Sequence, residues 1–244
     1  MPAPYFNDEK FPNAQKEYVL WIDIMGTKNF MSTSLRTSSL FICKLHMAIL
    51  EAKTENMHIY PVMDGAYITT KNQGEMRTFI KSVFTSLGEL FMNESNPLHQ
   101  FIVKGAIAYG PVVHGKDIPK DCNEEIIGKN TEYMTSILLG MPMIQAVKGE
   151  KQAPPFGIYC DESVRMEEKN FSFRWYNWLS GKNQRKALLE AMIKYFDYCE
   201  KHSYKLDYDE NKIREHKKKS VEYFEIKTLY QPSIFDGWYF FVQN

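Results

Sequence analysis

Three features are scarce in this sequence of 244 residues: cysteine, net charge and long apolar runs. The four cysteines lie far apart and form no C-x-x-C pair, so neither a disulfide framework nor a zinc site is expected. The 30 acidic residues balance the 30 basic ones, so no overall field attracts nucleic acid or an anionic membrane. No apolar run approaches the roughly 18 residues of a membrane span, and the first residues lack a signal-peptide pattern. We therefore expect a cytoplasmic protein that binds neither nucleic acid nor membrane.

Several common catalytic motifs are also missing. The sequence has no G-x-S-x-G, Walker or H-E-x-x-H motif to support hydrolase, P-loop or zinc chemistry. Hydrophobic residues make up 44% and aromatic residues 14% of the chain, which is typical of a globular protein with a buried core. We expect a core domain over residues 1–168. The composition changes after it, and residues 169–244 are predicted to form a C-terminal extension packed on that core.

The apolar periodicity of the first half predicts the order β-α-β-β-α-β. The expected elements are a strand at 17–24, a helix at 34–54, a hairpin at 57–70, a helix at 75–94 and a strand pair at 101–115, interrupted at Gly110-Pro111. The apolar positions of the first helix are Leu35, Leu40, Ile42, Leu45, Met47 and Leu50. This order predicts an α+β fold of the ferredoxin-like or palm type, with a mixed, mostly antiparallel sheet and helices on one face.

The second half is less regular. Residues 116–135 are charged and irregular, which indicates a loop or insertion. A helix is expected at 141–152 and a strand at 156–163. The C-terminal extension is expected to be α/β, with a helix at 185–202 and strands at 222–231 and 237–243.

Two aspartates stand at the ends of predicted strands. Asp23 ends the apolar run "VLWI", and Asp64 lies at the tip of the hairpin. In a β-α-β-β arrangement the first strand and the hairpin are commonly neighbours, so both carboxylates could meet at one end of the sheet. Two such carboxylates repel unless one is protonated or a divalent cation neutralises them. Oxygen ligands of this kind suit Mg²⁺ or Mn²⁺ shared with substrate phosphates.

The turn after Asp23, "IMGTK", is a candidate phosphate-binding segment. Backbone N–H groups at a strand-to-helix junction bind phosphate, and Gly26 permits a close approach at the turn that Thr27 continues. Lys28 could reach the phosphates, although a lysine early in a helix is usually only solvated. Taken singly, Asp23 could be a helix N-cap and Asp64 a turn residue. Their order along the chain favours a two-metal phosphate site.

Four motifs in order resemble those of the class III nucleotidyl cyclases. They are "WIDIMGTKNF", "YPVMDGAYI", "KGAIAYGPVVHG" and "GMPMIQAVKGE", and the resemblance spans roughly residues 17 to 165. The "KGAIAYG" form is most similar to the Pycsar pyrimidine cyclases of bacterial anti-phage defence. The resemblance implies a cyclase core built on the β-α-β-β-α-β sheet.

The resemblance also implies a mechanism and a partner. The nucleotide's 3′-hydroxyl would attack the α-phosphate and expel pyrophosphate, with two Mg²⁺ or Mn²⁺ ions bridged by Asp23 and Asp64 and assisted by the Ile24 carbonyl. Sites of this family lie between two protomers, so a homodimer is implied.

The resemblance assigns the base-reading positions to Tyr60 and Ile137. Tyr60 replaces a lysine that many adenylyl cyclases of the family use, and Ile137 replaces an aspartate that reads the adenine amino group. Both departures argue against ATP and favour a pyrimidine nucleoside triphosphate. We favour UTP because of Tyr60, with CTP as the alternative; tyrosine is also simply a common strand residue.

Two lysines take the places of family arginines. Counting from Gly140, Ala146 and Glu150 match the helix motif, and Lys148 occupies the position of the arginine that stabilises the transition state. Ile144 replaces the neighbouring asparagine. A lysine can neutralise developing charge, although it lacks arginine's bidentate fork. Lys104 replaces the arginine that opens the family's "R-G" strand. A structural role is expected for it in preference to a catalytic one.

The expected function is a uridylate cyclase whose cyclic UMP is a second messenger in anti-phage defence. A separate cyclic-nucleotide-sensing effector would respond to the product rather than contact the enzyme. One alternative is a degenerate cyclase-homology module that binds nucleotide or dimerises without catalysis, which the missing asparagine and arginine favour. Another is a different metal-dependent phosphotransfer enzyme on a palm-like sheet, although no G-G-D-E-F-like loop is present.

Overall fold

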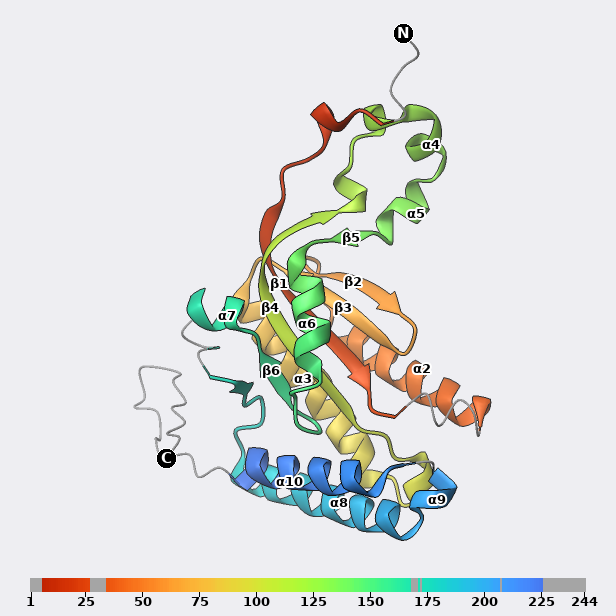
Figure 1. Ribbon diagram of the computed structural model, residues 1–244, viewed down its shortest axis with the longest axis vertical. Coiled ribbons are helices and arrows are strands. Elements are labelled where there is room, and N and C mark those ends of the chain that lie inside the picture. Colours follow the sequence, from red (N-terminus) through yellow and green to blue (C-terminus); the bar gives the residue numbers. More distant parts are fainter. Residues whose placement is uncertain (1–5, 27–33, 168–170, 172, 207, 226–244) are drawn as a thin grey trace.

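The fold is described here from a computed structural model, which places residues 6–26, 34–167, 171, 173–206 and 208–225 (Figure 1). Its sheet has the strand order β2-β3-β1-β4-β6-β7, and β5 pairs with β4. The strands are β1 (Gln15–Ile24), β2 (His58–Val62), β3 (Gly65–Thr70), β4 (Val103–His114), β5 (Leu138–Leu139), β6 (Ile158–Cys160) and β7 (Trp175–Tyr176). All pairings are antiparallel except that of β4 with β6. The predicted α+β class and β-α-β-β-α-β order are confirmed.

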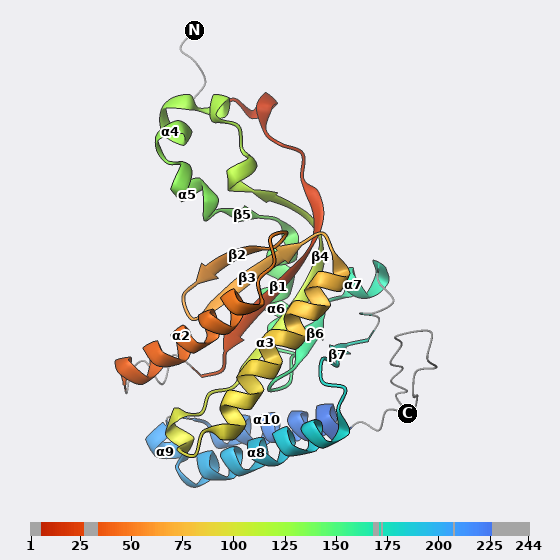
Figure 2. The same cartoon turned by 180° about the vertical axis from the view of Figure 1, so that it is seen from behind.

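Helices α2 (Leu35–Ala52) and α3 (Gln73–Asn93) cover one face of the sheet, as predicted. Alternate residues of β1, such as Leu20 and Ile22, pack with both helices in the main hydrophobic core. The intervening residue Trp21 lies on the other face and packs with Ala146 of α6 (Met141–Glu150). Figures 1 and 2 show α6 and α3 on opposite sides of the sheet, so α6 adds a helix to the face expected to lack one.

The apolar face expected for α2 is largely wrong. Leu35, Leu40, Met47 and Leu50 are exposed, whereas Phe41, Leu45 and Ile49 are buried in the core. The buried residues recur every four positions, which keeps their side chains on one side of the helix. The expected residues are spaced by two to five positions and do not share one side. The helix begins where expected because the Ser34 side chain accepts a hydrogen bond from the N–H of Thr37.

The strand pair expected at 101–115 is instead the single strand β4, which Gly110 and Pro111 do not interrupt. The segment after it is also not a plain loop. It forms short helices: η3 (Gly115–Asp117), η4 (Lys120–Cys122), α4 (Glu124–Lys129) and α5 (Thr131–Thr135). These build a small lobe at one end of the molecule around their own apolar cluster of Val113, Ile118, Cys122 and Ile127 (Figure 1). The segment is therefore an insertion with its own small core.

The C-terminal part consists mostly of helices α7 (Glu162–Glu167), α8 (Lys182–Lys201), α9 (Ser203–Leu206) and α10 (Glu210–Glu225). The helix predicted at 185–202 is confirmed as α8. The strand predicted at 222–231 is wrong for residues 222–225, which end α10; residues 226–231 and the strand predicted at 237–243 lie outside the described residues. Leu188, Met192 and Phe196 of α8 belong to the same core as α3. The boundary at residue 168 stays a prediction.

The remaining short helices are η1 (Asp8–Lys10), whose Lys10 pairs with Asp121 of the lobe, and η2 (Pro97–His99), which precedes β4. Within the part of the chain that the structure describes, no helix has both the length and the apolar character to cross a membrane.

Candidate active site

The two aspartates predicted to meet do lie at one end of the sheet. Asp23 is opposite Gly65 in the β1–β3 pairing, so the preceding residue, Asp64, stands beside the end of β1. The hairpin tip approaches β1 closely, because a Cβ on Gly65 would lie 2.4 Å from the Ile22 carbonyl oxygen. Both aspartates are half-buried. The neighbouring Met63 takes a positive φ of 53°, which closes the turn.

The carboxyl of Asp23 is held in an environment that disfavours its charge. Burial is the main cause that raises its pKa to about 7, and the nearby carboxylates of Asp64 and Glu150 add to it. The Ile24 backbone N–H, which donates to Asp23 Oδ1 at 2.9 Å, and the charge of Lys104 act in the opposite direction. The net effect is a cluster of acids with too little positive charge around it.

Lys104 is a cation whose charge acts on Asp23, but it already has a partner. It lies opposite Asp23 in the β1–β4 pairing, and its Nζ is 2.8 Å from Glu150 Oε1 at the end of α6. The two side chains are 14% and 10% exposed, so this is a largely buried ion pair. From the sequence, Glu150 is only a motif match and has no predicted role. The matched helix motif was the signal that could have identified it.

The donor set at this end of the sheet fits a hard divalent cation. It offers the carboxylates of Asp23 and Asp64, which are oxygen ligands of the kind that Mg²⁺ and Mn²⁺ prefer, and the part predicted for the Ile24 carbonyl stays a prediction. Among the residues whose placement is described, no group of three or more His, Cys, Asp or Glu side chains could hold a metal ion. An ion would therefore need oxygens from the backbone, from water or from substrate in addition to these two carboxylates.

A cavity of about 870 Å³ opens beside this end of the sheet. Met25 and Gly26 at the end of β1 and Ile102 and Lys104 at the start of β4 form one wall. The opposite wall comes from the C-terminal helices and their connections, through Tyr195, Ser203, Tyr204, Leu206, Tyr208, Asp209, Glu210, Lys212 and His216. Gly26 has a positive φ of 78°, which suits glycine at the predicted turn. Thr27 and Lys28, predicted to continue that turn, lie outside the described residues.

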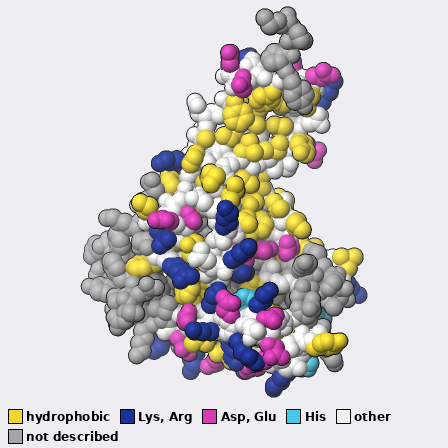
Figure 3. All heavy atoms as spheres, in the orientation of Figure 1, with side chains coloured by type: hydrophobic (Ala, Val, Ile, Leu, Met, Phe, Trp, Pro, Cys, Tyr) yellow, Lys and Arg dark blue, Asp and Glu magenta, His cyan; other side chains and the backbone are white. Residues whose placement is uncertain are grey.

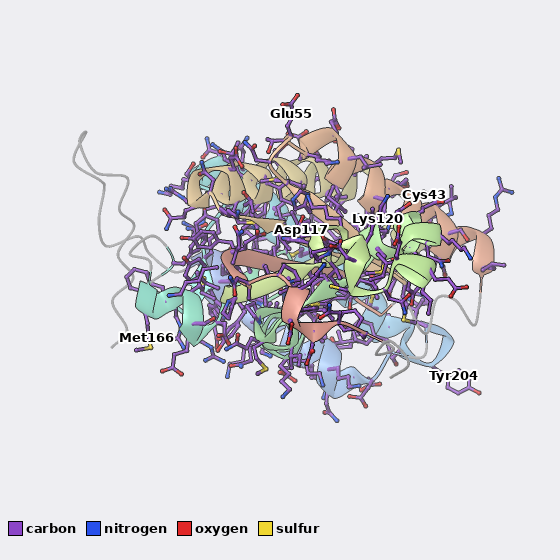
Figure 4. The ribbon with its side chains drawn as sticks, turned by 90° about the horizontal axis from the view of Figure 1, so that it is seen from above. Cys43, Glu55, Asp117, Lys120, Met166 and Tyr204 are labelled. Atoms are coloured by element: carbon purple, nitrogen blue, oxygen red, sulfur yellow. The ribbon has the colours of Figure 1, made fainter. Side chains whose placement is uncertain are left out.

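No motif in the C-terminal extension predicts chemistry, so the sequence does not predict this wall of the cavity. His216 of α10 accepts or donates a hydrogen bond at Nδ1 with the Tyr208 hydroxyl. Burial, followed by the positive charge of Lys104, lowers the pKa of His216 to about 4, which leaves the imidazole neutral at pH 7. Tyr204 lies at the mouth of the cavity and is 97% exposed; it projects outward from α9 (Figure 4).

Tyr60 and Ile137 lie together, but away from the aspartates. The Tyr60 hydroxyl hydrogen-bonds to Nδ1 of His114, which is the last residue of β4, whereas Lys104 is near its first. Tyr60 also packs with Leu138. The preceding residue, Ile137, accepts a hydrogen bond at its carbonyl from the N–H of Gly115 at 2.9 Å. Within one chain, the predicted base-reading residues therefore do not share a pocket with the predicted metal ligands.

His114 connects Tyr60 to a buried acid. Its Nε2 is 3.1 Å from Glu17 Oε1, and all three side chains are almost fully buried. Burial raises the pKa of Glu17, but the hydrogen bond and charge of His114, together with smaller effects of Thr69 and His58, outweigh it and lower the pKa below its ordinary value. A buried carboxylate paired in this way holds β1, β2 and β4 together, and the base-reading role of Tyr60 stays a prediction.

Lys148 is exposed on α6, two residues before Glu150. Ile144, which stands where the resemblance expects asparagine, is 47% exposed on the same helix. The roles given to these positions also stay predictions.

Comparisons with known proteins are distant. No family model matches the sequence, and no curated protein matches it either. Among solved structures, the fold is similar to the guanylyl cyclase domain of the RhoGC fusion protein from the aquatic fungus Blastocladiella emersonii. The TM-score is 0.45 and the identity 15%, over 64% of this chain and 85% of that chain. The architecture of this chain rests on its own topology, a mostly antiparallel sheet of the palm type with helices packed against it.

Proposed function

We propose that this chain is a nucleotidyl cyclase that converts a pyrimidine nucleoside triphosphate, UTP in preference to CTP, into a 3′,5′-cyclic monophosphate and pyrophosphate. The observation that carries the proposal is the meeting of Asp23 and Asp64 at the end of β1, beside a cavity of nucleotide size. A protein gains nothing in stability from placing two acids there without a cation. A metal-dependent reaction at this position would explain why the two carboxylates lie together.

Asp23, Asp64 and the Ile24 carbonyl would hold the ions. Two Mg²⁺ or Mn²⁺ ions would supply charge that lowers the pKa of the attacking 3′-hydroxyl and screens the triphosphate. Lys104 keeps the Glu150 carboxylate neutralised at the edge of the site, which limits the negative charge that an incoming nucleotide meets. Lys148, exposed on the same helix as Glu150, is the residue that we assign to charge developing on the α-phosphate.

The separation of the two half-sites supports a homodimer. Because Tyr60 lies beside His114 at the end of β4 and Asp23 lies opposite Lys104 near its start, a site that uses both sets takes them from two copies of the chain. Hydrophobic side chains gather on the face that carries α6 and on the lobe beyond it (Figure 3). The exposed ones there include Tyr133, Leu139, Met141 and Ile144. Such a surface is suited to pairing with a second protomer.

The resemblance to the Pycsar cyclases extends the proposal to a role. The cyclic nucleotide would be a second messenger in anti-phage defence, made in the cytoplasm and detected by a separate effector. The degenerate binding module remains the second candidate. It is favoured by the burial of Tyr60, which is 4% exposed and whose hydroxyl is already bonded to His114.

The test is to incubate the purified protein with Mn²⁺ and each of ATP, GTP, CTP and UTP separately, and to resolve the products by mass. We expect a cyclic pyrimidine monophosphate that disappears in Asp23→Asn and in Asp64→Asn. Asp8→Asn makes the same chemical change at an exposed position and should retain activity. A cyclic purine nucleotide would refute the role of Tyr60 and Ile137. If none of the four gives a product, cyclase activity is refuted in favour of the binding module.

A further inference from the structure

The cavity beside Gly26 joins the strand ends to the C-terminal helices. Lys104 links the two sides, because its charge acts both on Asp23 of β1 and on His216 of α10. Figure 1 shows α9 and α10 lying across the end of the molecule toward which β1 runs. Asp23 and Asp64 do not line the cavity themselves, but Met25, Gly26 and Lys104 beside them do, so the cavity lies between the aspartate end of the sheet and the C-terminal helices.

The charged groups that line this cavity are nearly all paired. Lys104 is bound to Glu150 at 2.8 Å. Glu210 Oε2 lies 3.1 Å from Arg214, and Asp209 caps the helix by accepting the Lys212 N–H at 3.0 Å. The exception is the side chain of Lys212, which forms no ion pair among the residues that the structure describes. The cavity thus retains one cation available to an anionic ligand.

The position of Lys212 is unfavourable for the helix that carries it. Helix α10 begins at Glu210, so Lys212 stands in its first turn. A positive charge in the first turn opposes the helix dipole, and alanine has a higher helix propensity than lysine. This exposed lysine therefore adds no stability to its own helix, and its charge is available to a ligand in the cavity.

We propose that this cavity receives the polyphosphate of the nucleotide and that Lys212 contacts its β- or γ-phosphate. This inference rests on the proposed function for the identity of the ligand. It assigns the C-terminal helices a part in substrate binding, since α10 supplies the cation that the strand ends lack. His216 contributes a neutral imidazole to the same wall. When the Tyr208 hydroxyl donates to its Nδ1, its Nε2 carries the hydrogen and can donate to a phosphate oxygen.

The direct test uses inorganic tripolyphosphate and the full-length protein without divalent ions. Isothermal titration calorimetry at low salt should show binding by the wild type that weakens about tenfold in Lys212→Ala, the loss of one charge-assisted contact. Lys212→Arg should restore most of the affinity. Lys218→Ala is the matched control, because Lys218 lies on the same helix with its side chain 78% exposed and does not line the cavity. Lys212→Ala should be at least as stable as the wild type, so unfolding cannot explain its weaker binding.

Three results would overturn the inference: no binding by the wild type, unchanged affinity in Lys212→Ala, or an equal loss in Lys218→Ala. A kinetic measurement separates this inference from the proposed function. If the wild type forms a cyclic nucleotide and Lys212→Ala keeps the same KM, the polyphosphate contact is wrong and the cyclase stands. If tripolyphosphate binding depends on Lys212 but no nucleotide is cyclised, the anion site stands and the cyclase is wrong.

Discussion

Replacing Asp23 by asparagine should stabilise the metal-free protein while abolishing the proposed cyclase activity. The pKa of Asp23 rises from an ordinary value of 3.8 to about 7 in the fold. The difference, about three pH units, corresponds to about 4 kcal/mol between the two protonation states. Asp23 is only half-buried, so solvent screening reduces this figure. We expect Asp23→Asn to raise the free energy of unfolding by about 2 kcal/mol at pH 8, because asparagine keeps the shape without the charge.

The stability that Asp23→Asn gains over the wild type should increase as the pH rises. Between pH 3.8 and about 7 the folded protein binds more protons at Asp23 than the unfolded chain does. The wild type therefore loses stability at this group as the pH rises through that window, and the penalty is constant above it. The advantage of asparagine is expected to be full at pH 8, smaller at pH 6 and close to zero near pH 4.

Urea unfolding followed by tryptophan fluorescence, in the presence of a chelator, measures the effect at each pH. Asp8→Asn serves as the control, since it removes a carboxylate from an exposed position and should change little. If Asp23 is a metal ligand as we propose, added Mn²⁺ should raise the melting temperature of the wild type but not that of Asp23→Asn, because an ion held only by the folded state stabilises it. A variant less stable than the wild type at pH 8, or a gain that does not vary with pH, would refute the reasoning.

Three further substitutions, with Gly128→Ala as a control, test the buried contacts of the sheet. Lys104→Met leaves the buried Glu150 carboxylate without its partner and should lower the free energy of unfolding by about 3 kcal/mol in urea titrations. Gly65→Ala places a Cβ 2.4 Å from a carbonyl oxygen of β1, so it should lower both the melting temperature and the affinity for Mn²⁺ measured by calorimetry. Gly128→Ala, which meets nothing within 4 Å and lies in α4, should leave the affinity for Mn²⁺ unchanged and should not lower the melting temperature. His114→Leu leaves a buried carboxylate of β1 unpaired and should cost about 3 kcal/mol at pH 7 by urea unfolding; a cost near zero would mean that this acid is protonated.

The core topology could be predicted because its signals are local. The apolar run of β1, the Asp64-Gly65 turn and the caps of α2 and α3 each lie within a few residues of the element they define. The orientation of α2 could not be predicted in this way. Leucines lie on both sides of that helix, and only packing against the sheet and α3 decides which are buried.

The C-terminal part shows the same limit. An aromatic-rich segment such as "EYFE" has a high β propensity, yet residues 222–225 end the helix α10. Tyr223 and Phe224 are buried there in the common core, and Arg185 of α8 donates a hydrogen bond to the Phe224 carbonyl at 2.9 Å. Tertiary contacts therefore override the local preference.

The sequence by itself determined that Asp23 and Asp64 would meet, because strand ends and hairpin tips occupy fixed places at the edge of an antiparallel sheet. Only the tertiary structure decided what surrounds them. The Lys104–Glu150 pair joins a strand to a helix far along the chain, and Lys212 reaches the same cavity from α10. The position of Tyr60 beside His114 was also decided by packing. Such contacts form between elements that are far apart in the sequence, and no local pattern of residues encodes how those elements pack.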